Sequence, residues 1–404
     1  MRKILVLSFI FFCLFFYGLI LSQTNIAVIK EDLKPTNYTG WYDYRGVMNV
    51  HTTRGIGSGR VAQVIKAAQD VGLDFLFITD LNIFDLPKIQ DGYHRQTLVL
   101  NGGSYSYLDS RLLVYEYKRR LAMETLGQAQ VQMADLLSQS GKDADQDLLI
   151  IAHPTKPGFT WKGAYPTGLD GLEVVNLKSV WQHAWNNSKL SFLWSAIIFP
   201  FNPDLALFRL YEEPEEELAL WDQLSQDRHT IGMLGTDATA RTGSIENFHF
   251  KFPRYQTSFS LASNHVLLRS ELTGEVDSDR EKIVGALARG NSYIGLDVLG
   301  SPKGFVAYLQ DIEGNHYPMG SKLKWKPGMK IVVHLPKKPR VPFEAAFLKD
   351  GQHIMSSNSV DTEYEIHGHG VYRVVIRVFL PLTILDGQRW VTWIYTNPFF
   401  INAL

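Results

Sequence analysis

The feature that most constrains the fold is a set of short apolar runs that each end in polar residues. The first, GVMNVHTTRGIGSG at residues 46–59, carries Asn49 and His51 two positions apart. Side chains two residues apart on a strand point to the same face, so we expect both to face the space beyond the strand end. Later apolar runs end in the same way at Asp80, at His153 and at residues 236–239. Parallel strands bring such ends together at one face of an α/β barrel, which predicts a single pocket.

The composition is that of a folded globular protein with more than one domain. The chain has 404 residues, of which 45% are hydrophobic and 20% are charged. Its formal net charge of -1 and the lack of a basic stripe argue against nucleic acid as a partner. The single cysteine, Cys13, excludes an internal disulfide.

The N-terminus predicts a membrane segment. Arg2 and Lys3 precede an uninterrupted apolar stretch at residues 4–21, which as a helix would span about 27 Å. No small-x-small cleavage pattern follows this stretch, which favours a signal anchor over a cleaved signal peptide. Positive charge at the N-terminus places that end in the cytosol, so we expect the globular part to be extracytoplasmic, either periplasmic or secreted.

The rest of the chain divides by its pattern into three parts. Residues 23–44 are polar and lack a sustained period, which predicts a stalk after the signal anchor or signal peptide at 1–22. Strand and helix patterns alternate over 45–303, which predicts a barrel or a large open α/β sheet. After Gly304, short strands such as GVYRVVIRV replace the helices, which predicts a small antiparallel β-sandwich at 304–404.

Five ordered segments of the chain resemble the PHP family, named for polymerase and histidinol phosphatase. They are NVHTTRGIGSG, GLDFLFITD, LLIIAHP, GLEVVN and GTDAT, and the later phrases ALARGNSYIG and WIYTNPFFI resemble the branch with a β-rich tail. The resemblance, over residues 44–297, implies a distorted (β/α)7 barrel that holds two or three divalent metals. In such a centre the metals activate water and clamp a phosphate ester.

Most of the metal ligands that the resemblance implies are missing from this chain. His51, His153 and Asp237 are retained, and Asp80 remains after its strand. The other ligand positions are occupied by Asn49, Ile56, Leu81, Ser104, Arg111 and Thr239. Leucine and isoleucine cannot coordinate a cation, and arginine repels one because it stays charged. We therefore expect no cofactor, or at most one divalent metal (zinc, manganese or iron) held by the three retained ligands.

A second hypothesis is that side-chain charge replaces the metal charge. Arg54, Arg111, Lys156 and Arg241 flank the pocket strands and are suited to a phosphate, sulfate or carboxylate group. The glycines of GIGSG precede a helix and would add backbone N–H donors for an anion. Asn49, Asp80, Ser104 and Thr239 complete the candidate binding residues.

Three other interpretations stay open at this stage. His51, His153 and Asp237 would serve a structural role if they only hydrogen-bond the strand ends. Ser104 with His153 and Asp237 would make a serine hydrolase, although no G-x-S-x-G elbow surrounds the serine. The four tryptophans at 161, 181, 185 and 194 would line an aromatic groove, or belong to the core, a partner contact or a membrane surface.

Together these patterns predict a membrane-anchored PHP phosphoesterase-like protein that is a pseudoenzyme. The predicted partner is an anionic small molecule or an envelope protein. The first alternative is an active phosphoester hydrolase with a reduced metal site. The second alternative is a structural envelope scaffold.

Overall fold

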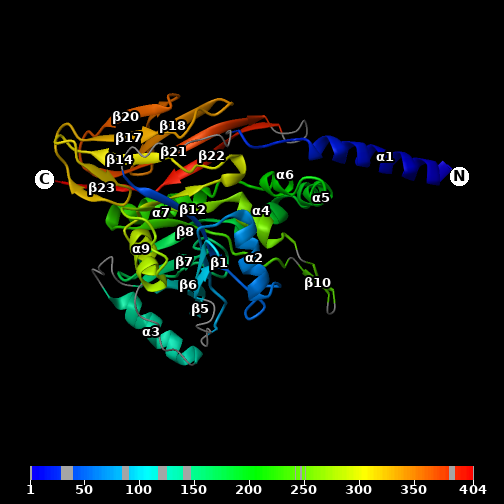
Figure 1. Cartoon of the computed structure of the whole chain (residues 1–404), viewed down its shortest axis with the longest axis horizontal. Helices are drawn as coiled ribbons and strands as arrows, with labels where there is room; N and C mark the ends of the chain where they lie inside the picture. The colour runs from blue at the N-terminus through cyan, green and yellow to red at the C-terminus, as the bar shows by residue number, and fades with distance from the viewer. Residues whose placement is uncertain are drawn as a thin grey trace.

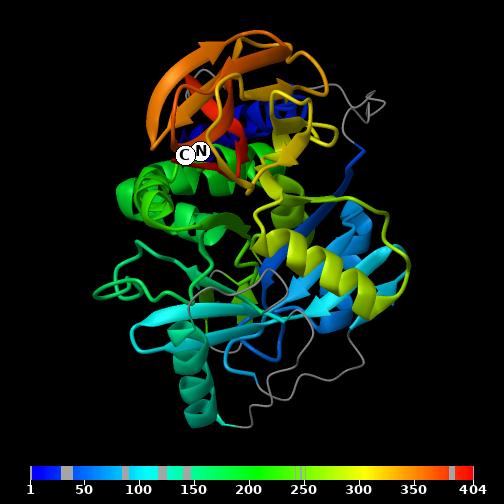
Figure 2. The ribbon, with the colours of Figure 1, turned by 90° about the vertical axis from the view of Figure 1, so that its left-hand side faces the viewer.

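The computed structural model describes residues 2–28, 40–83, 91–116, 125–139, 147–241, 243–245, 248–250, 252–381 and 387–403. In this part of the chain the fold is a mixed α/β arrangement (Figure 1). Two perpendicular views place the C-terminal strands at one end of the molecule and helix α3 (Leu126–Ser138) at the other (Figures 1 and 2).

The first sheet starts from the strand that carries the opening motif. Strand β1 (Tyr42–Val50) pairs in parallel with β2 (Phe75–Ile78), and β2 pairs in parallel with β4 (Thr97–Asn101). Helix α2 (Val61–Val71) connects β1 to β2 and buries the apolar face that its sequence spacing predicts. It ends at Gly72, whose φ of 74° is readily adopted by glycine.

A second, five-stranded sheet supplies the other pocket segments. Its order is β5 (Gly103–Tyr107), β6 (Ser110–Tyr115), β7 (Leu148–Ala152), β8 (Gly171–Asn176) and β9 (Ile231–Gly235). β7, β8 and β9 run parallel, so their carboxyl ends lie at one edge. The helices between β8 and β9 are α4 (Leu177–Asn187), α5 (Lys189–Ile198), α6 (Pro203–Phe208) and α7 (Glu215–Asp227).

The described strands do not form the closed (β/α)7 barrel that the resemblance implies. Isolated bridges, Val50 to Ala238 and Leu81 to Ser104, join the two sheets in place of continuous ladders. β1 pairs on its other side with β12 (Ser263–Leu268), which runs antiparallel, and the β5–β6 pair is antiparallel as well. These antiparallel pairs interrupt the run of parallel strands that a closed α/β barrel requires. The pocket segments still meet because the bridges hold the two sets of strand ends together.

The remaining elements complete the large sheet, form a four-stranded and a two-stranded sheet, or pack around the sheets as helices. They are β3 (Gly92–His94), β10 (Gly243–Ile245), β11 (Phe248–Phe250), α8 (Tyr255–Leu261), α9 (Val276–Ala288), β13 (Ser292–Gly295), β14 (Val306–Gln310), β15 (His316–Pro318), β16 (Lys322–Lys324), β17 (Lys330–His334), β18 (Phe343–Lys349), β19 (Gln352–Ser357), β20 (Asp361–Glu365), β21 (Gly370–Pro381), β22 (Gln388–Thr396) and β23 (Phe399–Asn402). The predicted strand GVYRVVIRV begins β21. β13 pairs with β22, so the 12-stranded sheet runs across the predicted boundary at residue 303. A separate β-sandwich is therefore not confirmed, and the domain limits stay predictions.

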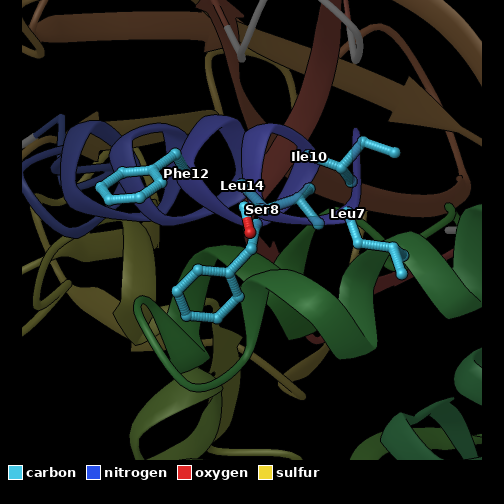
Figure 3. A pocket seen from close by; sticks show the side chains of 6 residues that line it. Leu7, Ser8, Ile10, Phe12 and Leu14 are labelled. Atoms are coloured by element: carbon cyan, nitrogen blue, oxygen red, sulfur yellow. The ribbon is translucent and has the colours of Figure 1, made fainter. Parts of the chain in front are cut away.

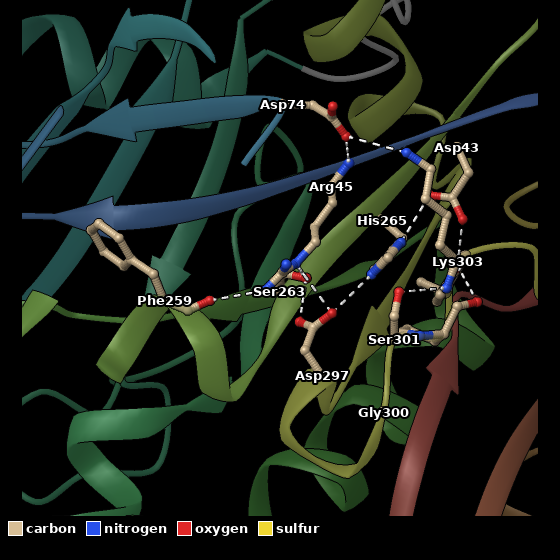
Figure 4. Close-up of polar contacts among 12 residues, drawn as sticks. Asp43, Arg45, Asp74, Phe259, Ser263, His265, Asp297, Gly300, Ser301 and Lys303 are labelled. Atoms are coloured by element: carbon tan, nitrogen blue, oxygen red, sulfur yellow. Dashed lines mark hydrogen bonds and ion pairs between the residues drawn. The ribbon is translucent and has the colours of Figure 1, made fainter. Parts of the chain in front are cut away.

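A buried ionic network ties β1 and β12 to the segment after β13 (Figure 4). His265 Nδ1 lies 2.8 Å from Asp43 Oδ1, and His265 Nε2 lies 3.5 Å from Asp297 Oδ1. Arg45 Nε lies 3.1 Å from the same Asp297 oxygen. Burial lowers the pKa of His265, but Asp43 and Asp297 outweigh it and raise that pKa to about 9.

Helix α1 (Arg2–Ser22) extends away from the globular part, and only its C-terminal end packs against it (Figure 1). By length and composition, residues Lys3–Ser22 are able to cross a membrane. Residues 29–39 of the predicted stalk lie outside the described residues. The described ends of that segment belong to the folded body: Val28 N donates to Leu299 O at 2.7 Å, and β1 already begins at Tyr42.

Candidate functional site

Three predicted residues from separate strand ends meet at one carboxylate. His51 Nε2 lies 3.3 Å from Asp237 Oδ1, and His153 Nε2 lies 3.3 Å from Asp237 Oδ2. All three side chains are buried. Both ring nitrogens of His51 and Asp237 Oδ1 lack hydrogen-bond partners among the described residues. The structure thus brings the retained trio together and leaves polar atoms of it unsatisfied.

The backbone turns sharply at the strand ends that supply the pocket. Asn49, His153 and Asp237 have φ values of 57°, 53° and 41°, in the left-handed region that non-glycine residues seldom adopt. Because Asn49 leaves the extended conformation, strict alternation with His51 does not hold. Asn49 Nδ2 donates to Glu173 Oε1 at 2.8 Å instead of facing Asp237. Clustering of such backbone conformations is a common property of functional sites.

Glu173 is a pocket residue that the sequence analysis missed. It lies within β8, fully buried, and also accepts from Asn176 Nδ2 at 2.7 Å. A Cβ atom on Gly235 would lie 1.7 Å from Glu173 Oε1, so the neighbouring strand has room for this carboxylate only with glycine there. Burial raises the pKa of Glu173, and His153 and the two amides partly offset that effect. A charged residue inside the apolar run LEVVN was the signal for it.

Lys178 is the second residue that the sequence did not reveal. It lies in the first turn of α4, with Nζ 3.6 Å from Asp237 Oδ1. Burial alone would raise the pKa of Asp237, but Lys178 and the two imidazoles hold it well below its usual range. An ammonium group therefore neutralises the carboxylate that the resemblance assigns to metal binding.

Two predicted cations lie beside the trio. Arg111 on β6 and Lys156 in the loop after β7 both lie over the ring of Phe159, with Arg111 Cζ at 5.3 Å and Lys156 Nζ at 5.0 Å from its centroid. Lys156 Nζ also donates to Gln182 Oε1 at 2.7 Å. The pKa of Lys156 is lowered by burial, and Lys178 and Arg111 lower it further while Asp237 opposes them. Arg111, Lys156 and Lys178 therefore form one cluster of mutually repelling charges, which we call the cation cluster.

The other predicted binding residues lie around the trio and differ in their contacts. Asp80 accepts from Thr52 N at 2.5 Å and from Thr52 Oγ1 at 2.6 Å. Ser104 is buried, and its hydroxyl lacks a hydrogen-bond partner among the described residues. The carbonyl of Thr239 accepts from Ser58 N at 2.9 Å. Arg241 is exposed.

The prediction that the GIGSG glycines offer donors to an anion is wrong. Gly55 N and Gly57 N both donate to Thr52 O, at 3.1 Å and 2.9 Å, and Gly59 N donates to the Tyr255 hydroxyl at 3.2 Å. Gly55 and Gly57 thus close the loop onto Thr52, and Gly59 ties it to α8, so all three N–H groups already have acceptors.

The arrangement does not support the predicted serine triad. His153 directs Nε2 to Asp237 and Nδ1 to Ser179 Oγ, at 2.8 Å. The serine in contact with the imidazole is therefore Ser179 and not Ser104. The Ser179 contact fixes which way the ring of His153 faces.

The donor set does not fit a centre of two or three metals. Among the described residues, no group of three or more His, Cys, Asp and Glu side chains is arranged to hold a metal ion. The two imidazoles approach different oxygens of Asp237, and Lys178 occupies the approach to Oδ1. The positions at which the resemblance implies further ligands include Ile56, Leu81 and Arg111, whose side chains do not donate electron pairs to a cation.

The four tryptophans do not line one groove. Trp181 is buried in the core, Trp161 stacks on Tyr107 at a centroid distance of 6.0 Å, and Trp194 contacts Tyr17 of α1 at 5.4 Å. A separate hollow lies on α1 itself, lined by Leu7, Ser8, Ile10, Phe11, Phe12 and Leu14 (Figure 3). Its lining has no charged group, so it offers nothing to an anion.

Comparisons with known proteins found similar chains among solved structures. Neither a protein-family model nor a curated protein matches the chain. Among solved structures it is similar to a two-domain protein from Bacteroides vulgatus that contains a predicted PHP-like metal-dependent phosphoesterase. The TM-score is 0.39 and the identity 10%, over 90% of this chain and 99% of that chain.

Two further structures show the same kind of similarity. One is PsfC from Pseudomonas syringae, with a TM-score of 0.34 and 12% identity over 59% of this chain and 87% of that chain. The other, from Bifidobacterium adolescentis, is described as a metal-dependent phosphoesterase, with a TM-score of 0.26 and 13% identity over 54% of this chain and 94% of that chain. Of the three structures, the Bacteroides vulgatus protein is described as PHP-like and the Bifidobacterium adolescentis protein as a metal-dependent phosphoesterase.

Proposed function

We propose that this chain is a membrane-anchored, extracytoplasmic phosphoesterase-like protein that binds a small anionic ligand and does not hydrolyse phosphoesters. The observation that carries this proposal is the contact between Lys178 and Asp237, at 3.6 Å, within the cation cluster. A side-chain ammonium here takes the charge role that a metal ion has in a phosphoesterase. It neutralises a carboxylate but cannot generate a hydroxide as a bound metal does.

Charge balance favours an anion as the ligand. Asp237 neutralises one positive charge, which leaves an excess in the cation cluster, and Arg111 Nε has no hydrogen-bond partner among the described residues. A bound phosphate, sulfate or carboxylate would accept hydrogen bonds from Arg111 and Lys156 and relieve their repulsion. A protein partner with an exposed carboxylate would satisfy the same groups.

The test is thermal stabilisation of the full chain by inorganic phosphate and sulfate at constant ionic strength, with chloride as the reference. Lys156→Gln removes a charge from the cation cluster and is expected to abolish the stabilisation. Lys162→Gln is the matched control, because Lys162 lies in the same loop but is exposed and pairs with Asp109 at 2.5 Å. Equal stabilisation of the wild type and both variants would overturn the anion site.

Retention of α1 as an anchor is part of the proposal, and the end of the helix supports it. Asn202 Nδ2 donates to Leu21 O at 2.9 Å and to Thr24 O at 2.8 Å. Leu21 is buried, and a Cβ atom on Gly18 would lie 2.6 Å from the Phe201 ring. Asn202 and Phe201 of the globular part thus contact the end of α1. Cleavage of α1 as a signal peptide would remove these contacts and expose both side chains.

A second candidate function is hydrolysis of a phosphoester with one remaining metal. It is favoured by the 3.3 Å contacts of Asp237 with His51 and His153, because ligands of a tetrahedral zinc stand about 3.3 Å apart when each bond is about 2 Å. His51, His153 and Asp237 would supply the ligands after a shift of their side chains, since no described group of such residues is arranged to hold a metal ion as it stands. The ion would lower the pKa of a bound water. Stoichiometric metal in the purified chain, together with phosphoester turnover that His153→Ala abolishes, would establish this function in place of the pseudoenzyme.

A further inference from the structure

We propose that helix α5 lies on the outer surface of the membrane that α1 crosses, with its apolar stripe in the lipid interface. This inference rests on the proposed anchoring by α1. It adds a second membrane contact, made by the globular part, which would fix the orientation of the whole protein on the bilayer.

The apolar stripe consists of Leu190, Leu193 and Ile197, which are 80%, 53% and 43% exposed. Their spacing of three and four residues places them on one face of α5. Trp185 at the end of α4 is 41% exposed and lies next to this stripe in the chain. Single exposed leucines are ordinary on a soluble surface, whereas a contiguous row on one helix marks an interaction site.

Helix α1 packs against another side of α5, and this contact indicates that the partner of the apolar stripe is the membrane. The rings of Tyr17 and Trp194 are 5.4 Å apart, and Leu21 packs in one cluster with Ile198 and Leu205. Most exposed side chains of α1 are apolar, as Leu7, Ile10 and Phe12 in Figure 3 illustrate, and α5 lies beside the C-terminal end of α1 in Figure 1. The apolar stripe of α5 is therefore continuous with the surface of α1, which the proposed anchoring places in lipid.

The depth of this contact agrees with an interfacial helix. Tyr17 lies one and a half turns before the end of α1 at Ser22, which corresponds to about 8 Å along the axis. Interfacial helices bury their apolar face by about 5–10 Å at the headgroup boundary. Trp185, Trp194 and Tyr17 have the residue types of an aromatic belt, and Lys189 begins α5 with its Nζ 5.9 Å from the Trp185 ring. A bilayer matches the stripe better than a protein groove does, because the anchor places it at that depth.

The experiment measures the lipid exposure of single positions in the full chain, reconstituted in phosphatidylcholine vesicles. Leu190→Cys, Leu193→Cys and Ile197→Cys are each made with Cys13→Ser and labelled with an environment-sensitive fluorophore. The matched control positions are Leu108, between β5 and β6, and Ile312, between β14 and β15, which are 79% and 64% exposed. β5 and β14 lie away from α1 in Figure 1. Quenching by lipids with a shallow spin label is expected to be at least about twofold stronger at the stripe than at the controls.

The native Cys13 lies near the middle of α1, and its label in the wild type, tested with a deep spin label, separates the two proposals. If Cys13 is quenched by lipid and the stripe matches Leu108, the docking of α5 is overturned while the anchor stands. If Cys13 is not quenched, the anchor fails and the docking fails with it. If the stripe is shielded from aqueous iodide without quenching by lipid, a second copy or another protein covers it, and the bilayer is excluded.

Discussion

Raising the pH should weaken the network around His265, because this buried imidazole is held in its charged form between Asp43 and Asp297. Its pKa is about 9, against the ordinary 6.5. At about 1.4 kcal/mol per pH unit, that difference corresponds to roughly 3 kcal/mol of stability. A group whose pKa is higher in the folded than in the unfolded state makes its full contribution to folding stability at pH values below its unfolded-state pKa. The contribution of His265 is therefore complete below pH 6.5 and lost as the pH rises to 9.

The assay compares urea unfolding of the wild-type chain and His265→Gln in detergent micelles from about pH 6 to about pH 10. Asp43 and Asp297, whose pKa values are lowered despite burial, stay ionised throughout this window. The variant should be less stable by roughly 3 kcal/mol at the acidic end, and the deficit should shrink toward the alkaline end. His183→Gln is the control, because His183 is exposed and 3.6 Å from Glu212. A deficit that is the same at every pH would refute a charged His265.

Three further predictions concern the pocket and the anchor. Lys178→Ala should lower stability by about 2 kcal/mol, because it leaves Asp237 buried without its charge partner, and it should increase zinc binding measured by calorimetry. Unchanged zinc affinity would contradict the exchange of metal for ammonium. Gly235→Ala should cost about 3 kcal/mol in unfolding, since its Cβ would displace the Glu173 carboxylate; a neutral effect would place that carboxylate elsewhere. Asn202→Asp can still accept from Leu205 N, 3.0 Å from Oδ1, but cannot donate to Leu21 and Thr24. It should lose about 1–2 kcal/mol in micelles, and wild-type stability would show that the end of α1 is not held there.

The positions of the pocket residues followed from local pattern alone. Apolar runs that end in polar residues predicted strand ends, and the structure brings His51, His153 and Asp237 within 3.3 Å contacts. Helical spacing likewise predicted α2, and an unbroken apolar run predicted α1. These features depend on periodicities of a few residues, which a sequence displays directly.

Only the tertiary structure showed that Lys178 lies at the centre of the pocket and that antiparallel strand pairs replace a closed barrel. Lys178 reaches Asp237 because α4 starts directly after β8, a contact between residues far apart in the chain that no local pattern encodes. The antiparallel pairing of β12 with β1, which breaks the expected barrel, also joins distant segments. The N–H groups of the GIGSG glycines donate to Thr52 and Tyr255, because the fold, and not the composition, sets where they point. The sequence by itself therefore determined that His51, His153 and Asp237 gather, and long-range packing determined that an ammonium group lies among them.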